Sequence, residues 1–145
     1  MKRYIHEAGG GRVRRWLASG TPATSRLSEV ELASALIRRW REGAFSAAER
    51  DRALSALASD LAALTVVEIV PAVAASARTL LMRHPLRAGD ALQLASCLHL
   101  REAVGEAVAF GGFDHRLNGA AAEEGLRLLP GPEPTAVRTG GRTTS

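Results

Sequence analysis

Apolar residues recur every three to four positions in several stretches of the chain, which is the spacing of one face of an α-helix. The clearest stretch begins at Leu27, runs through Val30 and Leu36 and stops at Gly43. The next begins at Ser46, which together with Glu49 has the spacing of a capping box. The pattern therefore predicts two consecutive helices, the second of which carries its apolar residues forward to position 64.

Further helices are predicted along the rest of the chain. They are a short helical pattern within 9–20, a helix from Pro71 to about His84, a strongly apolar helix led by Asp90 after a break at 85–89, and a helix headed by Asp114 and ended by Gly125. Proline is favoured in the first turn of a helix and glycine just beyond its end, which supports these boundaries.

Short runs of β-branched and apolar residues separate the helices. We predict an extended segment at 21–25, a mostly buried strand at 64–70, a short buried strand at 107–110 and a last strand at 126–129. Short strands that alternate with helices favour parallel pairing with helical crossovers, so the fold class is α/β. Residues 1–129 are expected to form one domain, and 130–145, rich in Pro, Gly, Thr and Arg, a disordered tail.

Composition and charge narrow the classes of partner. The 145 residues are 46% hydrophobic, which suits one compact domain with a core. No apolar run is long enough to cross a bilayer, and we expect a cytoplasmic protein. The net charge of +4 comes mostly from arginine, which favours a polyanionic partner, although arginines on solvated helix faces explain the charge equally well. Cys97, the single cysteine, is predicted to pack in the core.

Glu31, Asp90 and Asp114 share one structural context, because each lies near the beginning of a predicted helix. Helix beginnings collect at the carboxyl ends of parallel strands, where ligands bind in open sheets. Clustered carboxylates repel one another unless a hard cation such as Mg²⁺ or Mn²⁺ neutralises them. The alternative is that each acid caps its helix or interacts with the helix dipole. Glu29 is expected on a different face from Glu31.

Three stretches resemble, in order, the three later motifs of the PIN domain family. They are 24–32 (TSRLSEVEL), 86–95 (LRAGDALQLA) and 110–117 (FGGFDHRL). The resemblance implies a PIN-like three-layer α/β/α domain with a short parallel sheet. It also implies that Glu31, Asp90 and Asp114 bind Mg²⁺ or Mn²⁺ in an RNA-cleaving site. The most similar group is the VapC toxins, which implies a type II toxin–antitoxin ribonuclease, a cognate antitoxin partner and a homodimer.

The chain departs from the family pattern at two points. The family begins with a central strand that ends in a catalytic aspartate, and the start of this chain, Met1 to Tyr4, resembles the continuation just after that point. The resemblance therefore implies that this strand and its aspartate are missing, and we expect little or no metal-dependent nuclease activity from the chain as given. We therefore expect the strands near 22–25 and 107–110 either to stand apart or to pair directly with distortion. Gly112 occupies a position where the family commonly has threonine or serine. These departures leave open a catalytically dead PIN relative that binds RNA or an antitoxin, or a bare α/β scaffold with an interaction role.

The remaining candidates carry weaker signals. The histidines share no ligand spacing and are interpreted as surface or helix-end residues; they are His6, His84, His99 and His115. Several arginines are candidates for contacts with RNA phosphates, or else lie on a solvated face; they are Arg14, Arg15, Arg87 and Arg116.

Overall fold

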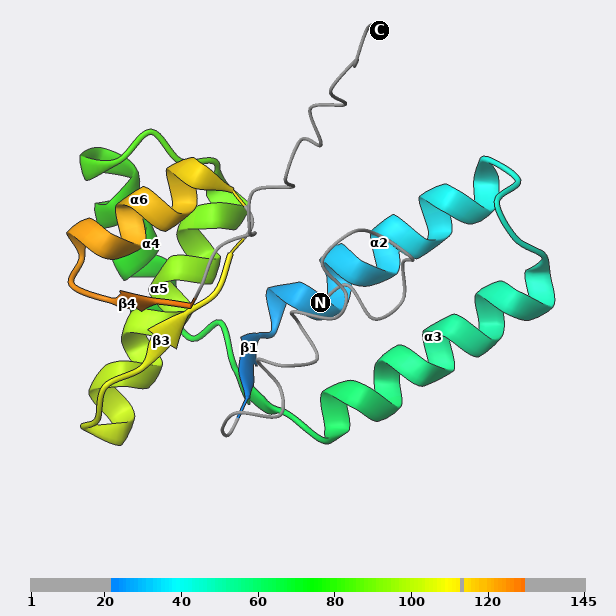
Figure 1. The fold of residues 1–145 in the computed structure, drawn as a ribbon, viewed down its shortest axis with the longest axis horizontal. Helices are drawn as coiled ribbons and strands as arrows, with labels where there is room; N and C mark the ends of the chain where they lie inside the picture. The colour runs from blue at the N-terminus through cyan, green and yellow to red at the C-terminus, as the bar shows by residue number, and fades with distance from the viewer. Residues whose placement is uncertain (1–21, 113, 130–145) are drawn as a thin grey trace, which may run out of the picture.

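The structure is a computed structural model, and it describes residues 22–112 and 114–129. These residues form an α/β arrangement of helices and short strands, as predicted (Figure 1). The element order is β1 (Ala23–Ser25), α2 (Leu27–Arg41), α3 (Ala47–Ala62), β2 (Thr65–Val67), α4 (Pro71–Arg83), α5 (Ala88–Val104), β3 (Ala109–Phe110), α6 (His115–Glu123) and β4 (Arg127–Leu128). The helix predicted within 9–20 and the tail predicted from 130 lie outside the described residues.

Local signals in the sequence set most of the helix boundaries. The capping box at the start of α3 is confirmed, because the Ser46 hydroxyl accepts from the Glu49 amide at 3.1 Å and the Glu49 carboxylate accepts from the Ser46 amide at 2.7 Å. Pro71 begins α4, as predicted. Gly125 follows α6 with a φ of 84°, a left-handed conformation that glycine adopts without steric cost.

Some predicted boundaries were wrong, and β3 begins at Ala109, two residues later than the strand predicted at 107–110. Helix α5 begins at Ala88, so Asp90 lies inside its first turn and does not lead it. Strand β2 is only three residues long, with Val67 as its buried member, while Glu68 to Val70 are exposed. The strand ends early because Val70 already serves as the N-cap of α4.

The strands form two separate parallel pairs. β1 pairs with β2, placing Thr24 opposite Val66, and β3 pairs with β4, placing Phe110 opposite Leu128. Within the described ranges β1 and β3 are not paired with each other, which is one of the two alternatives stated above. The predicted short parallel sheet is thus divided between two pairs.

Helix α5 joins the two halves of the described fold. It contacts α4, α6, β1 and β2, and its first turns also contact α2. One core cluster is built around it from buried residues of α4, α5, α6 and β3, including Val73, Leu80, Leu94 and Ala121. A second cluster, around Leu36, lies between α2 and α3. Figure 1 shows these two helices side by side as a hairpin on one side of the molecule, with α4, α5 and α6 on the other.

None of the described helices has the length and apolar character needed to cross a membrane.

Shortening one side chain in the core around α5 should lower the stability of the fold substantially. Leu94 has 0% of its surface exposed, so Leu94→Ala should lower the free energy of unfolding by about 2–5 kcal/mol through lost burial and a residual cavity. Val30 on α2 is 66% exposed, and Val30→Ala serves as the control. Urea denaturation of both variants checks the assignment, and equal losses would contradict it.

Candidate functional site

The Glu31 carboxylate lies against the first turns of α5. Gln93 donates from Nε2 to Glu31 Oε2 at 3.2 Å, and Glu31 Oε1 lies 2.9 Å from the position that a Cβ atom on Gly89 would occupy. Asp90 follows Gly89 in the same first turn and is half-buried. The folded chain therefore brings Glu31 of α2 to the helix start that carries Asp90.

Small polar side chains hold the start of α2 on α5. Gln93 Nε2 also donates to Ser28 Oγ at 3.1 Å, and Ser28 Oγ lies 2.7 Å from Thr24 Oγ1. Deeper in the structure, Ser96 Oγ lies 3.0 Å from Ser25 Oγ, and both side chains are almost fully buried. These contacts fix the junction between β1 and α2 relative to α5.

A serine side chain also supports the beginning of α2. Ser25 Oγ accepts from the Leu27 amide at 3.2 Å, whereas the N-cap residue, Arg26, makes no capping bond with its side chain. Ser25 is therefore the residue whose side chain bonds a backbone amide of the first turn.

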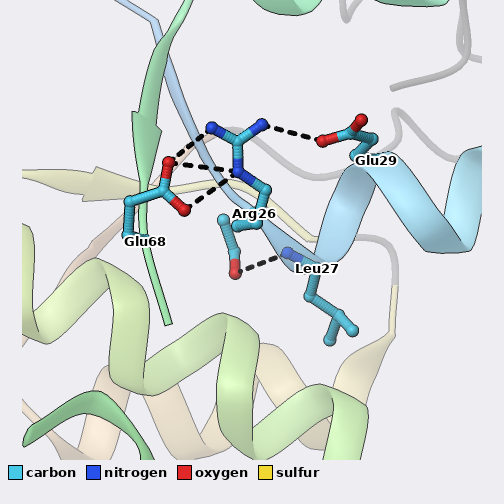
Figure 2. A network of polar contacts seen from close by, with 5 residues as sticks. Arg26, Leu27, Glu29 and Glu68 are labelled. Carbon is cyan, nitrogen blue, oxygen red and sulfur yellow. Dashed lines mark hydrogen bonds and ion pairs between the residues drawn. The ribbon is translucent and has the colours of Figure 1, made fainter. Parts of the chain in front are cut away.

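A second polar cluster lies where β1 and β2 end, and Figure 2 shows its geometry. Arg26 Nε donates to Glu68 Oε2 at 3.0 Å, a second guanidinium nitrogen binds the same carboxylate, and Arg26 Nη1 lies 2.7 Å from Glu29 Oε2. The bond to Arg26 lowers the pKa of Glu68, and Glu68 and Glu29 together raise the pKa of Arg26. Glu29 thus turns toward Arg26 while Glu31 turns toward Gln93, which confirms that they lie on different faces.

Glu68 is an acid of this region that the sequence analysis missed. It follows β2 directly and bridges to the residue after β1. The strand predicted at 64–70 contained Glu68, so no signal in the sequence indicated that this acid follows the end of β2. Because Glu68 is committed to Arg26, its charge is already compensated.

Asp114 is the N-cap of α6. Its Oδ1 accepts from the Leu117 amide at 3.2 Å and from the Arg116 amide at 2.8 Å, and these two bonds lower the pKa of the carboxyl group. The capping role that the sequence left as an alternative is therefore realised at Asp114. Both bonds use the same oxygen, Oδ1.

Gly112 lacks the hydroxyl that the family pattern provides, and Asn118 occupies the adjacent space. Asn118 Nδ2 donates to the Gly112 carbonyl oxygen at 3.0 Å, and Asn118 Oδ1 lies 2.8 Å from where a Cβ on Gly112 would be. Among the described residues, Asn118 Oδ1 is a buried side-chain oxygen without a hydrogen-bond partner. A serine or threonine at position 112 would therefore displace the Asn118 amide.

The predicted ligands fit a divalent cation only in part. Glu31 and Asp90 supply the carboxylate oxygens that Mg²⁺ and Mn²⁺ prefer, and they lie at one helix start. Within 22–112 and 114–129, however, no three His, Cys, Asp or Glu side chains are grouped so that they could hold a metal ion. Asp114 is not gathered with the other two, and the ligand role of all three remains a prediction.

Two other residues discussed from the sequence have structural roles. His84 ends α4 and is buried, with Nε2 2.7 Å from Glu124 Oε1 and Nδ1 3.2 Å from Glu123 Oε2, so it ties α4 to the end of α6. Cys97 is partly buried against the core, and desolvation raises the pKa of its thiol to about 11. Neither residue belongs to the site.

Only some of the arginine and histidine candidates lie within the described residues. Arg87 and Arg116 are exposed, next to Ala88 and Asp114 respectively. His6, Arg14 and Arg15 lie outside the described residues.

The cap at Asp114 predicts a pH-dependent contribution to stability. The folded pKa of Asp114 is lowered, so its stabilisation should be present above the unfolded carboxyl pKa, about 3.9, and should be lost as the pH falls through the folded value. Asp114→Ala should therefore lower the melting temperature at neutral pH and match the wild type in strong acid. Asp114→Asn keeps a capping oxygen and serves as the control. A melting difference for Asp114→Ala that is unchanged in strong acid would contradict the capping role.

Comparison with known proteins identifies a family. None of the curated proteins matches the chain. The PIN domain model matches residues 5–121, a range that contains Glu31, Asp90 and Asp114 together with all five described helices up to Ala121 of α6. Because this match covers most of the chain, the protein belongs to the PIN domain family.

Proposed function

We propose that this PIN protein is a metal-dependent endoribonuclease of the VapC toxin type, in which Glu31, Asp90 and Asp114 bind Mg²⁺ or Mn²⁺. The family is generally one of nucleases. One observation carries the assignment to this site: the Glu31 carboxylate lies 2.9 Å from the Cβ position of Gly89, the neighbour of Asp90. This contact supports a shared site for two acids that are far apart in sequence.

Each acid has a distinct part in the proposed site. Glu31 and Asp90 provide negatively charged oxygen donors from two helices, and Gln93 orients Glu31. Asp114 binds backbone amides through Oδ1, which leaves Oδ2 for a ligand. When bound, a divalent ion would supply an activated water and stabilise negative charge on a phosphate.

An RNA substrate suits the charges around these helix starts. Exposed Arg87 stands one residue before α5, and exposed Arg116 stands two residues after Asp114. Guanidinium groups bind phosphate oxygens in a bidentate manner, so both are well placed to hold the backbone of a polynucleotide. A cognate antitoxin and a homodimer belong to the same proposal.

A catalytically inactive PIN relative that binds RNA or an antitoxin is the second candidate. One specific observation favours it: among the described residues no three His, Cys, Asp or Glu side chains are grouped so that they could hold a metal ion. RNA binding without cleavage would then depend mainly on arginine–phosphate contacts and would weaken steeply with salt.

The proposal predicts metal-dependent cleavage of RNA that depends on Glu31. Purified protein should cleave a single-stranded RNA with Mg²⁺ and lose this activity in EDTA. Glu31→Gln and Asp90→Asn should each reduce the rate about 100-fold or more, the usual scale for losing a group that stabilises charge in the transition state.

Glu29→Gln is the matched control, because Glu29 lies two residues from Glu31 but pairs with Arg26. It should retain the wild-type rate. RNA bound in a salt-sensitive manner but left intact with Mg²⁺ would favour the inactive relative, and equal rates for Glu29→Gln and Glu31→Gln would contradict the site.

A further inference from the structure

We propose that Gln93 and Gly89 act together as positioning residues that hold the Glu31 carboxylate at the start of α5. The inference rests on the function proposed above, which assigns Glu31 to a metal ion. It adds that α5 accommodates both oxygens of this carboxylate. The Gln93 amide binds one oxygen, and the absence of a side chain on Gly89 leaves room for the other.

The Gln93 amide is committed to the start of α2. Its Nε2 donates to Glu31 Oε2 at 3.2 Å and to Ser28 Oγ at 3.1 Å. A side-chain amide nitrogen carries two hydrogens, so these contacts use both of them. Rotation of the amide would break both contacts at once. The amide therefore holds one orientation.

The donor to Glu31 is also neutral. A lysine or arginine at position 93 would compensate the carboxylate in the way that Arg26 compensates Glu68. Gln93 orients Glu31 and leaves its negative charge available to a cation. The two carboxylates therefore differ: Arg26 neutralises the carboxylate of Glu68, whereas the Gln93 amide only orients the carboxylate of Glu31.

Gly89 makes room for the second oxygen. A Cβ on Gly89 would lie 2.9 Å from Glu31 Oε1 and 3.8 Å from Leu27 Cδ2, so only the carboxylate would be forced to move. Gly89 lies in the first turn of α5 and is not among the described glycines with positive φ, so its backbone does not require glycine. A side chain at position 89 would instead force the end of the Glu31 side chain to shift from its place beside α5.

The start of α5 is also free of a competing cap. Its N-cap residue, Arg87, makes no capping bond with its side chain. The positive end of a helix dipole favours a nearby negative charge. Glu31 is held beside this end by a neighbouring helix.

The test separates positioning from a structural role by using two changes with opposite effects on the helix. Gln93→Ala removes the amide donor. Gly89→Ala keeps a helical backbone and improves helix propensity, yet displaces the Glu31 oxygen. Glu102→Ala, an exposed residue near the far end of α5, is the matched control.

Calorimetric titration with Mn²⁺ is the first measurement. Gln93→Ala and Gly89→Ala should each weaken Mn²⁺ binding about 10–100-fold, the range for losing a residue that orients a metal ligand. Gly89→Ala should do so with a melting temperature equal to or above that of the wild type. Glu102→Ala should change neither quantity.

The side-chain amide signals of Gln93 give a second measurement without metal. In ¹H–¹⁵N spectra they should shift in Glu31→Gln and in Gly89→Ala and stay unchanged in Glu102→Ala. Unchanged signals in Glu31→Gln would overturn the contact itself.

The outcomes distinguish this inference from the proposed function. Loss of Mn²⁺ binding in Glu31→Gln beside unchanged affinity in both Gln93→Ala and Gly89→Ala would overturn the positioning role alone. Failure of the wild type to bind Mn²⁺ would overturn the metal assignment and the inference with it.

Discussion

The docking of the β1–α2 junction onto α5 is the interaction on which the site depends. Helix α5 is the element that contacts both strands of the first pair as well as α4 and α6, so whatever is fixed to its first turns is fixed to the core. The hydroxyls of Ser25 and Ser96 meet in the buried part of this junction, and Gln93 reaches Ser28 and Glu31 at its more exposed part. An apolar contact of similar size would hold the helices together but would not orient a carboxylate.

The acids differ in which group compensates their negative charge. Glu68 and Glu29 share Arg26, and Asp114 is bonded to the amides of its own helix. Glu31 receives a neutral donor, and no contact compensates its charge within the described residues. Glu31 is exposed to solvent, and its carboxylate oxygens are donors of the type that a hard cation selects.

Much of the fold follows from local rules that the sequence displays. The capping box at Ser46, the proline at the start of α4 and the glycine after α6 each act within a few residues, and the helices begin and end where these residues indicate. The start of α5 was misjudged for a physical reason: Gly89 signals a break when only neighbours in sequence are considered, whereas its lack of a side chain serves a contact with another helix.

The site was harder to predict because it is made of long-range contacts. Position at a helix start identified Glu31, Asp90 and Asp114, and that signal does not distinguish a helix cap, as at Asp114, from a free carboxylate. Gln93 meets Glu31 across 62 positions of sequence, and Arg26 meets Glu68 across 42. No periodicity or motif spacing reports such pairs, since they depend on how the helices pack.

Anomalous diffraction from a crystal grown with Mn²⁺ tests the central claim most directly. The account predicts a manganese peak within direct ligand distance, about 2–2.5 Å, of carboxylate oxygens of both Glu31 and Asp90. Absence of a peak there in well-ordered crystals, with both carboxylates visible and turned to solvent, would contradict it.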